Sequence, residues 1–188
     1  MIDVYLALGV RMPYSSAEVQ AVMVYGSYAQ RTVVHVGVGD GLLTALLLAA
    51  TETFTDTPIT KWPRVYGITG YTNHLEVMPR PSPEPGIIQR AVDFKLNPFA
   101  LSKRFCLFHG TSQVVAQDWV RAIRRPVNLL VLGDVRANAL HDWLPHLSPL
   151  GYVMTERGDQ RLIKPMFQAA HLEQIEQVGK LRVWQRIP

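Results

Sequence analysis

Apolar residues along the chain alternate between short runs rich in β-branched residues and longer stretches with helical spacing. The run 32–38 is apolar or β-branched at nearly every position, which is typical of a central parallel strand covered on both faces. Other apolar runs predict further strands, at 64–68, 104–109, 127–132, 152–155 and 180–187. Because the first five alternate with helical segments, the sequence predicts an α/β fold with a Rossmann-like, doubly wound, mostly parallel sheet.

The helical segments have recognisable start signals. The tetrapeptide Ser15-Ser16-Ala17-Glu18 is a Ser-x-x-Glu capping box, and it predicts a first helix over about 16–29. The turn Gly110-Thr111-Ser112 supplies an N-cap for a helix at 113–123. Four more helices are expected, at 42–50, 86–95, 137–146 and 165–178, and a turn at 148–151.

The segment 70–86 differs from the rest of the chain. Prolines there alternate with polar residues, which disfavours helix and central strand and favours an extended, partly polyproline-II loop. No repeat or linker interrupts the 188 residues, so we expect one domain, with an N-terminal helical segment at 1–30. The Pro-rich loop and an edge strand are the surfaces where a protein partner is expected.

The strongest local signal is the turn Gly37-Val38-Gly39-Asp40-Gly41, which lies between the strand at 32–38 and a helix. Glycines at alternate positions let the backbone reverse tightly and approach a ligand, while the helix N–H groups can meet an anion. The spacing is G-x-G-x-G rather than the dinucleotide pattern G-x-G-x-x-G. A tight connection without a ligand is the alternative, since packing of strand on helix alone can require glycine.

Composition and charge limit the remaining choices. Hydrophobic residues make up 48% and charged residues 18% of the chain, which is a globular composition. No apolar run is long enough to cross a membrane, and the N-terminus lacks the basic and apolar regions of a secretory signal, so a cytoplasmic location is expected. The single cysteine, Cys106, is expected to be a small core residue.

The net charge of +4 comes with 14 arginines and 5 lysines. The densest basic group is Arg121, Arg124 and Arg125, at the end of a predicted helix where cations complement the helix dipole. Nucleic acid is therefore a weakly supported partner. The histidines lack paired spacing such as H-x-x-x-H, so no metal site is predicted.

Four segments together resemble the class I S-adenosylmethionine (SAM)-dependent methyltransferases, in particular their small O-methyltransferase-like branch. The G-x-G-x-G turn resembles motif I of that superfamily. The stretches 105–112 and 127–134 look like its fourth and fifth landmarks, and 142–153 resembles its D-x-x-x-W-L-P segment. The resemblance covers about 30–187 and implies an antiparallel C-terminal edge strand.

The resemblance implies SAM as cofactor and assigns roles to individual residues. Gly37, Gly39 and Gly41 would line the methionine moiety, with His35 and Asp40 in the same cofactor-binding set. Thr69 would face the ribose, and Thr111 with Ser112 would flank the adenine. Asp134, which ends a central strand, would act as general base or orient the methyl acceptor.

Other roles remain open for several of these residues. Family members usually carry an acid where His35, Thr69 and Thr111 stand, because a carboxylate accepts ribose hydroxyl protons and suits a sulfonium ligand. His35 can instead be a core histidine bonded to nearby backbone, and Asp134 a helix cap. Trp119 and Trp143 are expected to anchor the core.

Three functions follow from these observations. The first is methyl transfer from SAM to an oxygen or nitrogen nucleophile of an unidentified acceptor. The second is a catalytically inactive relative that acts as a structural or interaction module. The third is an RNA or cap methyltransferase, which the basic charge favours but the missing lysine-aspartate-lysine-glutamate set disfavours.

Overall fold

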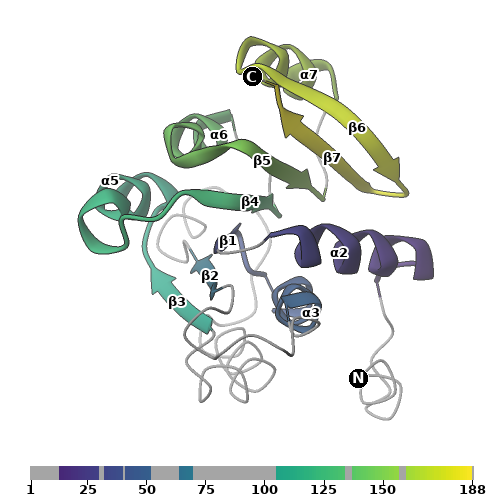
Figure 1. Cartoon of the computed structure of the whole chain (residues 1–188), viewed down its shortest axis with the longest axis horizontal. Helices are drawn as coiled ribbons and strands as arrows, with labels where there is room; N and C mark the ends of the chain where they lie inside the picture. Colours follow the sequence, from purple (N-terminus) through teal and green to yellow (C-terminus); the bar gives the residue numbers. More distant parts are fainter. Residues whose placement is uncertain are drawn as a thin grey trace, which may run out of the picture.

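The computed structural model describes residues 13–29, 32–39, 41–51, 64–69, 105–133, 137–156 and 160–187. Seven strands form one sheet in the order β3-β2-β1-β4-β5-β7-β6 (Figure 1). The strands are β1 (Thr32–Val36), β2 (Arg64–Thr69), β3 (Phe105–His109), β4 (Val127–Leu132), β5 (Leu147–Thr155), β6 (Leu172–Val178) and β7 (Leu181–Arg186). The first five are parallel, and β7 pairs antiparallel with both β5 and β6. The doubly wound, mostly parallel sheet with an antiparallel edge is confirmed.

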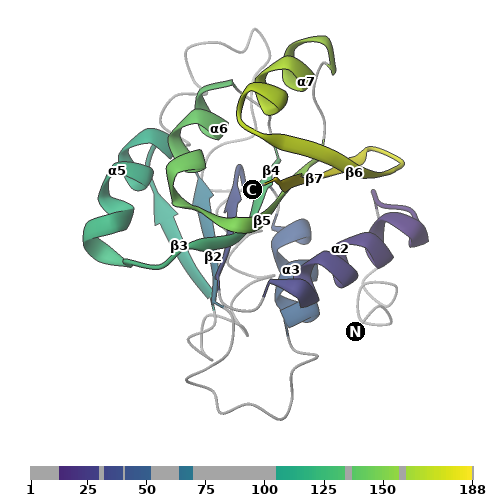
Figure 2. The same ribbon diagram turned by 45° about the horizontal axis from the view of Figure 1, so that its top comes forward.

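Helices cover both faces of this sheet (Figure 2). One face carries α2 (Ser16–Tyr28) and α3 (Leu42–Thr51), and the other carries α5 (Ser112–Ala122), α6 (Ala137–Trp143) and α7 (Gln160–Ala169). Strand side chains alternate between the two cores: Val33 packs with α2 and α3, whereas Val34 packs on the opposite face. The uninterrupted burial of β1 therefore has the predicted cause, a central position with a helical layer on each side.

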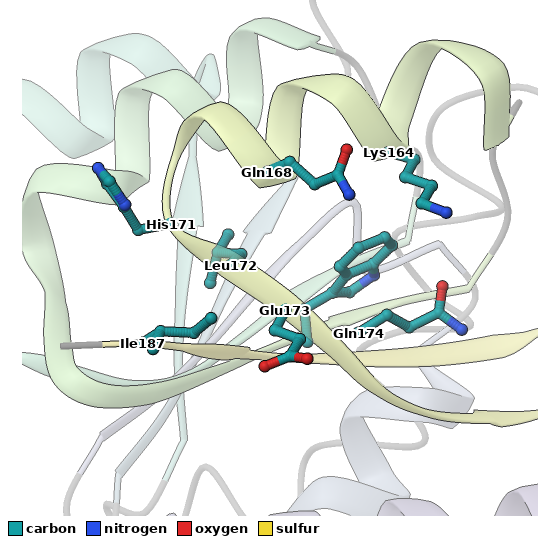
Figure 3. A pocket seen from close by; sticks show the side chains of 8 residues that line it. Lys164, Gln168, His171, Leu172, Glu173, Gln174 and Ile187 are labelled. Carbon is teal, nitrogen blue, oxygen red and sulfur yellow. The ribbon is translucent and has the colours of Figure 1, made fainter.

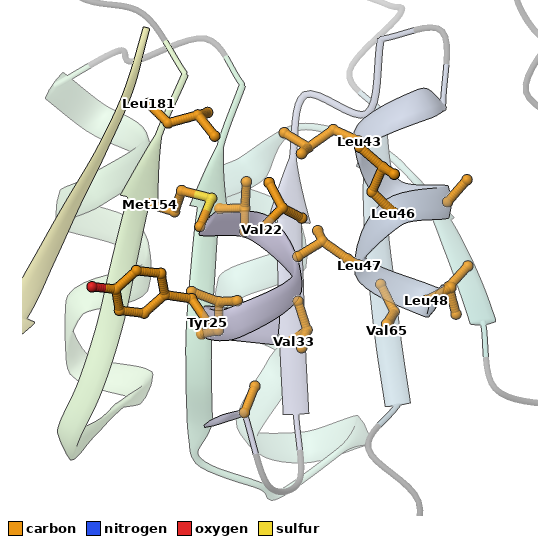
Figure 4. Packing of buried hydrophobic residues seen from close by; sticks show 14 of the residues in the cluster. Val22, Tyr25, Val33, Leu43, Leu46, Leu47, Leu48, Val65, Met154 and Leu181 are labelled. Carbon is orange, nitrogen blue, oxygen red and sulfur yellow. The ribbon is translucent and has the colours of Figure 1, made fainter. Parts of the chain in front are cut away.

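Helix α3 is buried along its whole length and lies beside α2 on the same face of the sheet (Figure 4). The two helices approach closely at Gly26, where an added Cβ would lie 2.5 Å from the Cβ of Ala50. A side chain at this position would have to push the helices apart. Gly26 thus fixes how near α2 lies to the helix that follows the glycine turn.

Several predictions from the sequence agree with the structure in detail. Helix α2 starts with the predicted capping box, in which Ser15 and Glu18 bond each other's backbone N–H groups. Trp119 and Trp143 are core residues, as predicted, at 2% and 0% exposure. The helix predicted at 86–95 and the Pro-rich loop at 70–86 lie outside the described residues.

The predicted helix at 165–178 is wrong. Helix α7 ends at Ala169, and 172–178 is strand β6, which forms an antiparallel hairpin with β7. His171, between the two elements, has a left-handed φ of 55° that ends the helix. The burial pattern lacks the buried face that an amphipathic helix would show, because Leu172 is the only buried residue of β6. Backbone pairing with β7 stabilises an extended conformation that local sequence does not reveal.

Three smaller expectations also need correction. The segment predicted as a turn at 148–151 lies inside β5, and an irregular register beside β4 absorbs the extra residues. The helix predicted to reach 146 ends at Trp143 and continues as a 3-10 turn over Leu144–His146, with Pro145 inside that turn. Cys106 is exposed, not a core residue, because β3 is an edge strand.

Candidate functional site

The glycine turn leaves the sheet where its strand order reverses. Strand β1 lies between β2 and β4, and the chain moves outward in one direction from β1 to β3 and in the other from β4 onward. In open α/β sheets a ligand crevice forms outside the carboxyl ends of the strands at such a point. The ends are held side by side here: Gly37 N donates to Ile68 O at 3.0 Å, and Gly133 N donates to Val36 O at 2.9 Å.

The three glycines of the turn all adopt left-handed backbone conformations. Their φ angles are 81° at Gly37, 57° at Gly39 and 84° at Gly41, and residues other than glycine rarely adopt such positive φ values. Among the residues that the structure describes, the atom nearest to a Cβ added to Gly39 would be Gly37 O, at 3.9 Å. The turn therefore brings three residues without side chains to the crevice and leads directly into helix α3.

A fourth glycine, which the sequence analysis did not select, shapes the same place. Gly133 follows the last residue of β4, and a Cβ there would lie 2.6 Å from the carbonyl oxygen of Gly37. The turn can lie against the end of β4 only because position 133 has no side chain. The signal available in the sequence was a glycine directly after a strand that is apolar at all but one position.

Val38 fixes the turn to the neighbouring strand. Its side chain is 2% exposed, and its Cγ2 would lie 2.8 Å from a Cβ added to Gly67 on β2. The turn thus alternates two exposed glycines, Gly37 and Gly39, with one buried anchor. This alternation explains the G-x-G spacing in structural terms.

His35 lies beneath the turn. Its side chain is 1% exposed, and its Nδ1 is 2.7 Å from the hydroxyl of Thr44 on α3. The predicted alternative of a hydrogen-bonded core histidine is therefore confirmed, with a threonine side chain rather than backbone as the observed partner. Contact between His35 and a cofactor stays a prediction.

The other predicted polar residues lie along the carboxyl edge of β2 and β3. Thr69 ends β2 with 6% exposure, and its carbonyl accepts a bond from Gly110 N at 3.1 Å. Thr111 is the N-cap of α5, as the sequence predicted, since its hydroxyl accepts from Val114 N at 3.3 Å. The structure thus brings Gly37, Thr69 and Thr111 to one edge of the sheet.

Ser112 connects two helices on this side. Its hydroxyl accepts a bond from the indole N–H of Trp143 at 3.0 Å and also bonds the carboxyl group of Asp142. Burial raises the pKa of Asp142, and the bond from Ser112 partly offsets this rise. The remaining two predicted site residues, Asp40 and Asp134, lie outside the described residues.

Two further observations concern the described residues as a set. No three histidine, cysteine, aspartate or glutamate side chains within them are grouped as a metal would require. None of the helices in this set has the length and apolar character needed to span a bilayer.

Solved structures with the same architecture are numerous. A methyltransferase from Geobacter sulfurreducens has a TM-score of 0.64 at 14% identity, covering 99% of this chain and 87% of that one. TomG, an O-methyltransferase of tomaymycin synthesis from Streptomyces achromogenes solved in complex with SAM, has a TM-score of 0.66 at 11% identity, covering 99% and 87%.

A third neighbour is the TDP-rhamnose 3′-O-methyltransferase of calicheamicin biosynthesis, with a TM-score of 0.61, 12% identity, and coverage of 89% and 76%. This chain has the class I methyltransferase fold. No family model and no curated protein matches its sequence. The fold is thus shared with structural neighbours that are only 11–14% identical in sequence.

Proposed function

We propose that the protein transfers a methyl group from SAM to an oxygen or nitrogen nucleophile of an acceptor still to be identified. The observation that carries the proposal is the turn of three left-handed glycines at the reversal point of the methyltransferase sheet. Bare backbone beside a helix N-terminus fits a ligand with a carboxylate and a polar chain, as the methionine part of SAM has. TomG, a structural neighbour with the same fold, was solved in complex with SAM.

The proposed assignment distributes the cofactor along the carboxyl edge of the sheet. Gly37, Gly39 and Gly41 would hold the methionine part with Asp40, Thr69 would face the ribose, and Thr111 with Ser112 would flank the adenine. Bound SAM supplies an electrophilic methyl group on its sulfonium. His35 belongs to the same proposed cofactor-binding set, and its contact with Thr44 would also hold the turn in place from below.

Asp134 is the proposed catalytic residue. It directly follows Gly133 in the sequence, after the end of β4. Strand β4 is the neighbour of β1, the strand that leads into the glycine turn. A carboxylate at this position would accept the proton that an acceptor hydroxyl or amine loses as its new bond to carbon forms. Positioning of the acceptor against the methyl group would supply most of the rate enhancement.

One observation favours a second candidate, a catalytically inactive module with this fold. The hydroxyls of Thr111 and Ser112 are already engaged in internal bonds, and His35 is buried where family members carry an acid. Such a module would bind a protein partner through the free edge at β6 or the Pro-rich segment 70–86.

Calorimetric titration separates the two candidates. We expect the full chain to bind SAM and S-adenosylhomocysteine with micromolar affinity, and Gly39→Val to abolish binding because valine is strained at φ 57° and projects into the open crevice. Leu150→Ala, an exposed position on β5, is the control that should leave binding unchanged. Absence of heat from the unaltered protein at millimolar ligand would reject the enzyme and support the inactive module.

A further inference from the structure

Three hollows join at the sheet edge opposite the glycine turn. The first, about 600 Å³, lies between the C-terminus of α5 and the start of β5. The second, about 380 Å³, shares Pro149 with the first and continues to the end of β7. The third, about 590 Å³, shares His171 and Ile187 with the second and runs between β6 and α7 (Figure 3). We call these joined hollows the basic track.

Cations outnumber carboxylates among the side chains that line the basic track. Five line it, namely Arg121, Arg124, Arg125, Arg186 and Lys164, against the single carboxylate of Glu173. Within the described parts of the chain, none of the five forms an ion pair with a carboxylate. An excess of positive charge of this size in one concave strip attracts anions from solution.

The helix dipole explains only part of this charge. It accounts for cations at the C-terminus of α5, where Arg121 lies in the last turn. Arg186 and Lys164 belong to β7 and α7, which the chain reaches about 40 residues or more later and folds back against the same edge. Only the tertiary structure combines the three elements, so the charge is a property of the surface.

The arginines at the end of α5 are held by the core. The indole N–H of Trp119 donates to Arg125 O at 2.8 Å, and Arg124 N donates to Trp119 O at 3.1 Å. Arg124 adopts a left-handed φ of 55°, which is uncommon for a residue with a long side chain. A rigid backbone reduces the entropy lost when the guanidinium groups engage a ligand.

Arg186 is similarly positioned at the middle of the track. Its Nη1 donates to Leu147 O at 2.8 Å and to Leu144 O at 3.5 Å. These carbonyls orient the guanidinium without neutralising it. The remaining N–H groups of the fork stay available for an anionic oxygen.

We propose that a single-stranded nucleic acid binds along the basic track through its phosphate backbone. Planar guanidinium groups match phosphate oxygens in pairs and also stack on bases. Each hollow has the volume of a small-molecule site and so admits single nucleotides. Prolines and Ile187 provide apolar surface between the cations, against which base faces can lie.

This surface goes beyond the proposed methyl transfer. Its first hollow lies at the amino ends of β4 and β5 and its third between β6 and α7, whereas the glycine turn lies at the carboxyl ends of β1 and β2. Binding on the track would anchor a nucleic acid without occupying the cofactor crevice. Loss of one activity would therefore leave the other measurable.

Fluorescence anisotropy with the full chain tests the proposal. The probe is a labelled single-stranded RNA of about 15 nucleotides, titrated between about 50 mM and about 200 mM salt. We expect the logarithm of the binding constant to fall linearly with the logarithm of salt concentration, with a slope of about −2 to −4. An acidic polyglutamate of similar length should compete only weakly.

Matched variants locate the site. Arg124→Gln with Arg125→Gln should weaken binding by about tenfold or more and reduce the salt slope. Arg182→Gln removes the same kind of charge from β7 outside the track and should have little effect. Glu173→Gln removes the only lining carboxylate and should tighten binding severalfold.

The proposal is overturned if RNA does not bind at the lower salt concentration, or if polyglutamate displaces it equally well. It is also overturned if the double arginine variant, with an unchanged melting temperature, binds as the unaltered protein does. SAM titration of the same variant should be unaffected, which distinguishes failure of this proposal from failure of the proposed methyl transfer.

Discussion

The hydroxyl of Thr44 lies 2.7 Å from Nδ1 of His35, and this bond joins helix α3 to the strand that carries the glycine turn. Both residues are buried, at 0% and 1% exposure. A polar contact in the core requires both partners, because a buried polar group that loses its partner keeps the cost of its desolvation.

Thr44→Val should therefore destabilise the protein by about 1–3 kcal/mol, although valine has nearly the same shape. Thr44→Ser retains the hydroxyl and should lose less. Urea denaturation followed by far-ultraviolet circular dichroism measures both. A loss in Thr44→Ser with none in Thr44→Val would show that the methyl group, not the hydrogen bond, stabilises this position.

Gly133→Ala should displace the glycine turn. The added Cβ would lie 2.6 Å from the carbonyl oxygen of Gly37, and backbone cannot move aside as easily as a flexible side chain. We expect a loss of about 1–3 kcal/mol in the free energy of unfolding, together with weaker binding of SAM in calorimetry. A variant with native stability and native affinity would contradict the assigned contact.

Glu18 should make the stability depend on pH. Burial alone would raise the pKa of this carboxyl, but the N–H groups of Lys180 and Ser15, at 2.8 and 2.6 Å, lower it below its ordinary value. A depressed folded-state pKa contributes stability above the unfolded-state pKa, and this stability is lost as the pH falls through the folded-state pKa.

The expected result is a stability difference between the unaltered protein and Glu18→Gln that is largest near neutral pH and shrinks on acidification below the ordinary pKa of glutamate. Thermal melts over this pH range provide the measurement. Glu173→Gln, at an exposed position on β6, is the control. A difference that stays constant with pH would show that Glu18 acts by shape rather than by charge.

Thr155→Val should stabilise the protein. Thr155 is fully buried at the end of β5, and its hydroxyl has no hydrogen-bond partner among the residues that the structure describes. Replacing an unsatisfied hydroxyl by a methyl of similar size should add about 1 kcal/mol to the free energy of unfolding. Thr155→Ala, which leaves a cavity, should instead lower the melting temperature, and a decrease in both variants would indicate an unrecognised partner for the hydroxyl.

Local sequence was sufficient to predict the elements around the glycine turn, namely α2, β1 and α3. The capping box at Ser15 and Glu18, the β-branched run of β1 and the glycines after it all act within a few residues of one another. Their conformations are fixed by hydrogen bonds to near neighbours and by sterics at φ. For this reason the boundaries of α2, β1 and α3 could be predicted closely.

The sequence by itself thus determined the fold class and the position of the glycine turn, because both follow from the period of apolar residues and from backbone conformations that only glycine adopts readily. Tertiary structure alone decided that 172–178 is a strand, that His35 lies under the turn bonded to Thr44, and that Arg186 joins the arginines of α5 at one edge. Each of these depends on contacts between segments far apart in the chain, and those contacts exist only once the sheet has formed.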